Sequence, residues 1–152
     1  MTKVHIVAVQ TMLEEAARMF PKETGGILMG TKSKEGGHIL QAIGPGPKAI
    51  HKEFSFKPDD DFHEKQMASV FNSTNGTVTY LGEWHTHPTS AAYLSDRDKK
   101  TLKDIAFYKP SQLPQPLMLI IGFRPFQIRL WQYTEKRIFT HTCYKELYFS
   151  IT

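Results

Sequence analysis

The sequence predicts a mixed α/β fold in which a central sheet is flanked by helices, within a single domain of residues 1–152. Short apolar runs rich in β-branched residues alternate along the chain with stretches whose apolar residues recur at helical spacing. Glycine and proline clusters separate these runs. The 152 residues, 40% hydrophobic and 22% charged, suit one compact core, and no internal repeat, linker or low-complexity block divides them.

The first half of the chain is expected to alternate strands with two helices. The first helix is expected over residues 12–20, where apolar side chains recur every three or four positions, and Pro21 ends it. A second helix is expected after Asp59, because consecutive aspartates favour the positive N-terminal end of a helix. A turn at Glu35-Gly36-Gly37 joins two of the strands. The predicted strands are Val4–Val9, Thr24–Thr31, His38–Ile43 and His51–Phe56.

The second half is expected to add further strands and one more helix. A strand over Val78–His87 is followed by a helix that begins near Ser95, and the proline-containing segment 110–116 ends this helix. Leu117–Phe123 and Gln127–Tyr133 are expected to pair with each other as strands. The last residues are expected to form a final strand and a loosely packed tail.

Nothing in the sequence indicates a membrane or secreted protein. The longest apolar stretch, Leu117–Phe123, is far too short to cross a bilayer, and the residues after Met1 lack the apolar core of a signal peptide. A soluble, cytoplasmic protein with no membrane partner is therefore expected. Because Cys143 is the only cysteine, the chain can form no internal disulfide, and any metal must be held by nitrogen and oxygen ligands.

The formal net charge is modest and predicts no nucleic-acid partner. It is +4, from 19 basic and 15 acidic residues that are mixed along the chain, and it favours an acidic partner only weakly. The densest basic cluster has two interpretations, a solvated helix face and a surface that orients a negatively charged substrate. The cluster consists of Arg97, Lys99, Lys100 and Lys103.

The most informative motif is His85-Thr86-His87-Pro88, followed after six residues by Ser95-Asp96-Arg97-Asp98. Alternate side chains of a strand point to the same face, so both imidazoles can reach one ion. Asp98 falls in the first turn of the next helix, on the face of its apolar residues. Two histidines and one carboxylate leave a fourth position for water, the arrangement of a catalytic zinc site. His85, His87 and Asp98 are therefore the predicted ligands of one Zn²⁺ per chain.

Each half of this motif also has a purely structural interpretation. A His-x-His pair is often only two strand residues, and Ser95-x-x-Asp98 can be a helix capping arrangement. Capping and oxyanion stabilisation by Ser95 do not exclude one another. The remaining histidines lack ligand spacing and are expected at the surface or in a satisfied core position: His5, His38, His51, His63 and His141.

A hydrolytic metal site also needs a proton carrier. Glu23 is the best candidate, because it precedes a glycine-rich strand whose glycines permit close approach of backbone or substrate. Glu83 could orient a ligand, or only form a cross-strand pair. Trp84 and Tyr93 flank the ligands and could line a substrate groove, although core packing is the alternative for Trp84.

These residues together resemble the JAMM (MPN+) metalloprotease family, also called the JAB domain. The resemblance rests on an upstream glutamate before a glycine-rich strand, then His-x-His-Pro, six residues and Ser-x-x-Asp. It implies a curved, cytidine-deaminase-like mixed sheet. It also implies that Glu23 is the general base and acid, that His85, His87 and Asp98 bind zinc, and that Ser95 stabilises the oxyanion.

The resemblance further implies a zinc isopeptidase or peptidase that cleaves after the C-terminal tail of a ubiquitin-like or conjugated protein. The compact chain is most similar to the stand-alone prokaryotic, deubiquitinase-like branch, whose partners include ubiquitin-activating and ubiquitin-conjugating-like enzymes of antiphage (CBASS-type) operons. The substrate tail is expected to lie along an exposed strand edge, with its Gly-Gly close to the zinc. The alternatives are a processing peptidase for a sulfur-carrier precursor and a noncatalytic MPN-type binding module.

Overall fold

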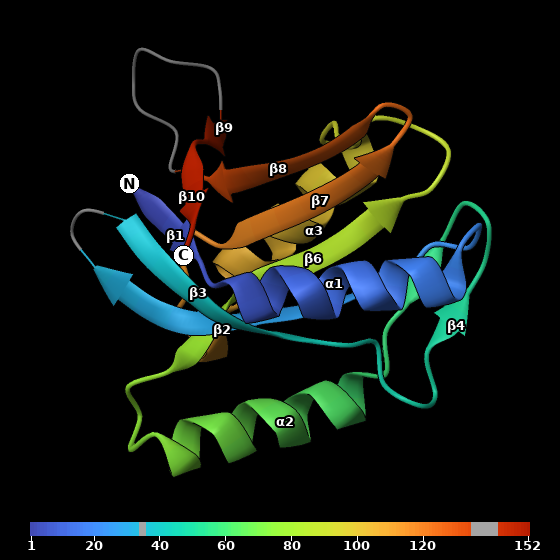
Figure 1. The fold of residues 1–152 in the computed structure, drawn as a ribbon. Coiled ribbons are helices and arrows are strands. Elements are labelled where there is room, and N and C mark those ends of the chain that lie inside the picture. The colour runs from blue at the N-terminus through green and yellow to red at the C-terminus, as the bar shows by residue number, and fades with distance from the viewer. Residues whose placement is uncertain (34–35, 135–142) are drawn as a thin grey trace.

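The protein, described here by a computed structural model for residues 1–33, 36–134 and 143–152, is built around one curved sheet. The sheet has eight strands in the order β10-β1-β3-β2-β6-β7-β8-β9, with parallel and antiparallel neighbours, and β4 and β5 form a separate two-stranded sheet (Figure 1). The predicted mixed α/β class is confirmed. The strands are β1 (Thr2–Val4), β2 (Gly25–Ser33), β3 (Gly36–Ile43), β4 (Ile50–His51), β5 (Phe56–Lys57), β6 (Thr79–His87), β7 (Leu117–Phe123), β8 (Phe126–Tyr133), β9 (Tyr144–Leu147) and β10 (Phe149–Ile151).

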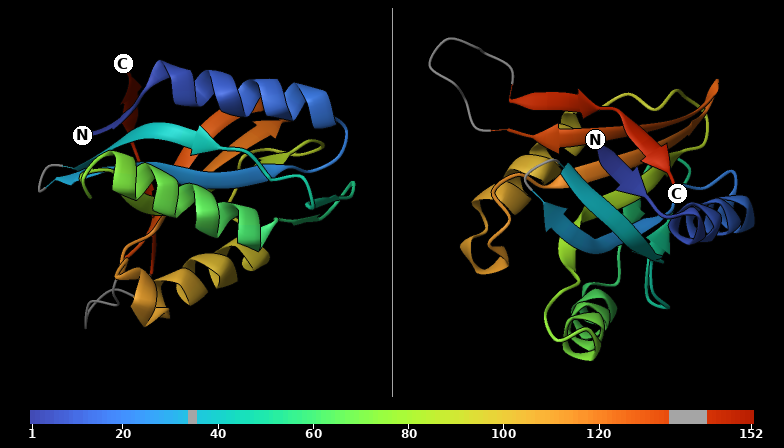
Figure 2. Two further views of the ribbon diagram at one scale, coloured as in Figure 1. Left: turned by 90° about the horizontal axis from the view of Figure 1, so that it is seen from below. Right: turned by 60° about the vertical axis from the view of Figure 1, so that its left-hand side comes forward.

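The helices lie on both sides of this sheet. Helix α1 (Ile6–Met19) covers one face, and α3 (Asp96–Phe107) packs on the opposite side (Figure 2). Helix α2 (Asp60–Ser73) contacts β2 and β6. A short 3-10 helix, Lys109–Ser111, follows α3. Among the described residues, no helix is both long and apolar enough to cross a membrane.

Strand β7 is buried on both faces and separates two hydrophobic cores. Leu119 and Ile121 belong to the core that includes most of the buried residues of α1, whereas Met118 and Ile120 pack with Leu102 of α3. A continuous apolar run without polar alternation is typical of a strand covered on both sides. The two cores, one beneath α1 and one beneath α3, therefore both depend on the side chains of β7.

The N-terminal segment differs from the prediction of a strand over Val4–Val9. The strand ends at Val4, and a helix begins at Ile6. The imidazole of His5 accepts a hydrogen bond from the Val7 backbone and caps the helix, and Val9 is buried on the helix face. Burial of the helix face outweighs the β-propensity of the branched residues, because packing decides where propensity is weak.

Two other predictions of strand structure were partly wrong. The segment His51–Phe56 is the centre of a hairpin, in which β4 pairs with β5, and not one strand. The C-terminal tail is not loosely packed, because β10 pairs with β1 and the backbone amide of Thr152 donates to Val4. Of the predicted turn at residues 35–37, Glu35 lies outside the described residues.

The glycine-rich strand β2 is in the interior of the sheet, between β3 and β6, so it offers no exposed edge for a substrate. Its glycines serve close packing instead. A Cβ at Gly25 would overlap the Trp84 carbonyl oxygen, and one at Gly26 would overlap the Ile43 carbonyl oxygen. The expectation that a substrate tail lies along an exposed strand edge stays a prediction, and β2 is not that strand.

Strand β6 positions the predicted ligands. It runs antiparallel to β2 and parallel to β7, and His85 lies opposite Ile120 in the register with β7. Paired residues of neighbouring strands share a face of the sheet. Because Ile120 faces α3, the side chain of His85 also faces α3, which is the element that carries Asp98.

Candidate metal centre and active site

Two histidines project from the end of β6 toward the first turn of α3. His85 and His87 are two residues apart on one face of the strand, and the strand ends at His87, directly before Pro88. Thr86 points to the opposite face, where its hydroxyl accepts a hydrogen bond from the Thr24 backbone. The alternation of the strand thus separates two ligand candidates from a structural residue.

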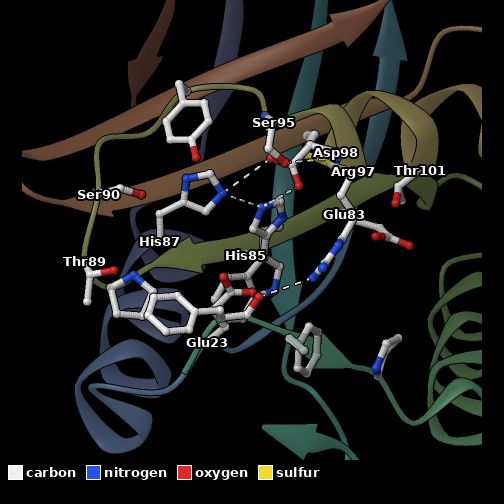
Figure 3. A pocket seen from close by; sticks show the side chains of 17 residues that line it. Glu23, Glu83, His85, His87, Thr89, Ser90, Ser95, Arg97, Asp98 and Thr101 are labelled. Atoms are coloured by element: carbon white, nitrogen blue, oxygen red, sulfur yellow. Dashed lines mark hydrogen bonds and ion pairs between the residues drawn. The ribbon is translucent and has the colours of Figure 1, made fainter. Parts of the chain in front are cut away.

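Asp98 meets these histidines from the first turn of α3. Its Oδ1 lies 3.0 Å from His85 Nε2, and its Oδ2 lies 3.4 Å from His87 Nε2. The two Nε2 atoms are 3.1 Å apart, and all three groups offer atoms within 4.8 Å of one another (Figure 3). The structure thus brings the three predicted ligands together.

The chemistry of this group fits a metal ion. Ligand atoms about 2.0 to 2.2 Å from a tetrahedral zinc lie roughly 3.3 to 3.6 Å apart, close to the separations found here. His87 Nδ1 contacts the Ala91 carbonyl oxygen at 2.9 Å, which directs Nε2 toward the other ligands. Burial alone would raise the pKa of Asp98, but the hydrogen bonds with His85 and His87 hold that pKa well below its ordinary value. Asp98 therefore stays a carboxylate, the form that binds a cation.

Ser95 and Asp98 cap helix α3 reciprocally. Ser95 Oγ accepts from the Asp98 backbone amide at 3.2 Å, and Asp98 Oδ2 accepts from the Ser95 backbone amide at 2.9 Å. This capping box fixes the first turn of the helix and with it the Asp98 carboxylate. Since Ser95 Oγ acts as the acceptor in the cap, its O–H hydrogen is left to donate elsewhere.

Glu23 lies at the edge of the same cavity, in the connection between α1 and β2. Its side chain is half-buried, and burial raises the pKa of its carboxyl above the ordinary value, while His85 and His87 offset part of that increase. A raised pKa suits a group that must both take and give a proton near neutral pH.

The cavity around these residues has a volume of about 490 Å³. The Tyr93 ring, 50% exposed, stands 5.1 Å from the His87 ring, and Phe54, 68% exposed, forms part of the lining from the β4–β5 hairpin. The cavity is thus polar at its centre and partly aromatic at its rim.

The comparison of the sequence with protein families decides the classification. The model of the family described as prokaryotic homologs of the JAB domain matches residues 5–134. The chain belongs to this JAB family.

Individual relatives agree with this assignment. A protein of Sinorhizobium fredii named probable metalloprotease y4qB is 30% identical over 115 residues, which cover 74% of this chain and 70% of that protein. A CD-NTase/cGAS isopeptidase of Escherichia coli is 30% identical over 101 residues, or 66% of this chain and 62% of that protein, which is less than two thirds of its length. The solution structure of protein DSY2949 from Desulfitobacterium hafniense, 19% identical, shares the fold with a TM-score of 0.70 over 100% of this chain and 93% of its own.

These findings confirm the resemblance to the JAB family and the expectation that the chain is an enzyme of the metallopeptidase class. The site of this JAB chain supports a metal ion through His85, His87 and Asp98.

The other residues that the sequence singled out divide between structural and cavity positions in this JAB chain. Trp84 is buried in the core and donates to the Ile43 carbonyl, so core packing is its use. His63 is a satisfied core histidine whose Nε2 contacts the Gly44 carbonyl at 2.8 Å. Of the basic cluster, Arg97 lines the cavity, while Lys100 pairs with Asp104 on the solvated face of α3. His141 lies outside the described residues.

Glu83 faces the cavity on the side of Arg97 and Thr101 (Figure 3). Burial raises the pKa of its carboxyl to about 7. No hydrogen bond joins it to His85 in the described part of the chain, so the structure gives no support for an orienting role. Sequence reasoning missed His51, whose Nδ1 lies 2.9 Å from the Glu23 carbonyl oxygen. The two residues are 28 positions apart, and no motif signals their contact.

Proposed function

We propose that this chain is a zinc-dependent isopeptidase that releases a protein conjugated through its C-terminal tail. The observation that carries this proposal is the convergence of His85, His87 and Asp98 within 4.8 Å in a cavity that Glu23 also lines. Relatives named CD-NTase/cGAS isopeptidase support cleavage of an isopeptide bond to a conjugated protein. The resemblance to the stand-alone prokaryotic branch extends this proposal to a place in an antiphage (CBASS-type) operon, beside ubiquitin-activating and ubiquitin-conjugating-like enzymes.

One Zn²⁺ per chain is the metal that the donor set favours. Two imidazoles and one carboxylate form a three-ligand set that leaves a fourth position open, as in catalytic zinc sites, and no cysteine thiolate takes part. When bound, zinc supplies a Lewis acid for the scissile carbonyl and lowers the pKa of a water molecule to about 7.

Two side chains of the site then supply proton transfer and stabilisation of the oxyanion. The Glu23 carboxylate accepts a proton from the attacking water and later donates it to the nitrogen of the departing lysine amine. The Ser95 hydroxyl donates a hydrogen bond to the oxygen that gains negative charge as the carbonyl carbon becomes tetrahedral. No covalent bond to the enzyme is needed in this sequence of steps, because water is the nucleophile.

The rim of the cavity suits the tail of a protein substrate. The exposed rings of Phe54 and Tyr93 offer apolar contacts to an extended chain that approaches the ligands. The β4–β5 hairpin is separate from the large sheet, and its strands are candidates to add a substrate strand through backbone hydrogen bonds.

A pair of substrates that differ in one bond tests the proposal. The zinc-loaded chain is incubated with a ubiquitin-like protein or CD-NTase from the same operon, joined either to a lysine side chain or to the N-terminus of the same reporter. We expect faster cleavage of the isopeptide-linked form. Cleavage of the linear form alone would favour the sulfur-carrier peptidase. No cleavage of either form by chain carrying one zinc would contradict the proposed enzyme and favour the binding module.

A further inference from the structure

The backbone of Glu23 is held by the β4–β5 hairpin. Glu23 lies outside the regular elements, after α1 ends at Met19 and before β2 begins at Gly25. Its backbone amide donates to the Lys52 carbonyl oxygen at 2.8 Å, and its own carbonyl oxygen lies 2.9 Å from His51 Nδ1. The hairpin therefore binds both backbone polar groups of the candidate proton carrier.

The direction of the second hydrogen bond follows from its acceptor. A carbonyl oxygen can only accept, so His51 Nδ1 must carry the hydrogen that it donates to Glu23. The half-buried imidazole also contacts the Phe56 ring at a centroid distance of 5.3 Å. The turn of the hairpin is closed by the Lys52 amide, which donates to the Ser55 carbonyl at 2.9 Å. The position of the His51 Nδ1 donor is thus fixed by contacts within the β4–β5 hairpin.

The same hairpin reaches the cavity on its other side. Phe54 and Phe56 form part of the cavity lining, and Arg97 from α3 donates to the Phe54 carbonyl oxygen at 3.3 Å. The hairpin thus connects the helix that carries Asp98 with the segment that carries Glu23. A substrate that contacts Phe54 contacts the element that holds the Glu23 backbone.

We propose that His51 is a positioning residue, which fixes the Glu23 carboxylate relative to the predicted metal ligands through the Glu23 backbone. This inference rests on the proposed function, from which the role of Glu23 in proton transfer is taken. Without the His51 donor, the Glu23 carbonyl loses its partner and the carboxylate is held less precisely. Proton transfer is sensitive to displacements of about 1 Å, so the loss appears in kcat and not in KM.

Two variants of similar size separate the hydrogen bond from packing. His51→Leu removes the donor, whereas His51→Asn keeps an N–H donor near the position of Nδ1. We expect kcat to fall about tenfold or more in His51→Leu and to recover largely in His51→Asn. KM and zinc content are expected to match those of the wild type in both variants. Ile50→Ala, on the same strand with its side chain half exposed, is the matched control and should keep both constants.

Backbone amide exchange at residues 22–25 provides a readout that needs no catalysis. Exchange should quicken in His51→Leu and return toward the wild-type rate in His51→Asn. Wild-type kcat in His51→Leu, equal losses in both variants, or unchanged exchange would overturn the inference. If the wild-type chain cleaves no conjugate, the proposed function fails, and the exchange rates alone decide whether His51 holds Glu23.

Discussion

Ser95 joins folding and chemistry at one position. Its Oγ accepts a hydrogen bond from the Asp98 backbone amide in the capping box, and its hydroxyl hydrogen is the proposed donor to a developing oxyanion. A single substitution therefore affects two measurable quantities, the free energy of unfolding and kcat. The two are measured independently, and a threonine, which keeps the hydroxyl, serves as the control that preserves both hydrogen bonds.

Ser95→Ala is expected to lower the free energy of unfolding by about 1 kcal/mol through loss of the cap. It is also expected to lower kcat by about 10²-fold through loss of the oxyanion donor. Ser95→Thr should retain most of both. Denaturant unfolding and steady-state kinetics measure the two effects. A stability loss with unchanged kcat would restrict Ser95 to the cap.

The predictability of the site residues depends on their separation in the sequence. His85, His87 and Asp98 follow from strand alternation and the first turn of a helix, so their convergence could be inferred from local spacing. Glu23 could be proposed from the glycine-rich strand that follows it, but local spacing could not place it beside the ligands. His51 could not be inferred at all, because its contact depends on how a hairpin folds back onto a distant connection.

At the level of elements, the pairing of β6 with β7 requires a glycine at position 82. Gly82 has φ of +142°, a conformation that residues with a side chain rarely adopt, and a Cβ there would overlap the Leu117 carbonyl oxygen of β7. The pairing of β6 with β7 begins at Gly82 and extends to His85 and His87. Accurate placement of the ligands thus requires glycine several residues away.

Gly82→Ala is expected to lower the free energy of unfolding by roughly 2 to 4 kcal/mol, from backbone strain and overlap with β7. Gly44→Ala is the matched control, because a Cβ at Gly44 meets no atom of the described residues within 4 Å. The control should change stability by less than about 0.5 kcal/mol. Denaturant midpoints compare the variants, and equal losses in both would contradict the steric argument.

Helix α2 is anchored by Asp59, which accepts hydrogen bonds from the Phe62 and Lys48 backbone amides. The first of these is the main reason that the pKa of Asp59 is lowered in the folded chain. A lowered folded pKa adds stability above the unfolded value of about 3.8, and this stability is lost as the pH falls through the folded pKa. Asp59→Ala should therefore lower Tm at pH 7, and the difference from wild type should shrink below pH 4. A constant difference would argue against the ionised cap.

The elements most easily predicted were those with long periodic patterns. Helices α2 and α3 and the pair β7–β8 agree closely with the sequence, because caps and apolar periods mark them. The segment Val4–Val9 does not agree with the prediction, since its β-branched residues favour a strand while burial against the sheet favours a helix. The C-terminal strand β10 pairs with β1, from the opposite end of the chain, and no local pattern reveals such pairing.

The whole molecule brings four separate segments to one cavity. The connection after α1 supplies Glu23, the hairpin supplies aromatic rings, β6 supplies two histidines and α3 supplies Asp98. The curved sheet and the layers around it could be predicted as a class, but the distance between Glu23 and the ligands could not, because it depends on all four segments. A metal ion that binds β6 and α3 together should stabilise the entire fold.

Added zinc is expected to raise Tm by roughly 5 to 10 °C when its free concentration is about 100 times its Kd. Chelation should reverse the increase. His87→Ala should abolish it, whereas His38→Ala, outside the cavity, should retain it. Thermal unfolding with and without zinc measures the effect. An equal increase in His87→Ala would indicate binding elsewhere.

The most direct test of the central claim combines zinc content with cleavage of an isopeptide-linked conjugate. The wild-type chain, Glu23→Gln and His85→Ala are compared at equal concentration. The wild type should hold one zinc and cleave, Glu23→Gln should hold one zinc but cleave about 10³-fold more slowly, and His85→Ala should lose both zinc and cleavage. Wild-type cleavage by Glu23→Gln, or cleavage by wild-type chain that contains no metal, would contradict the account.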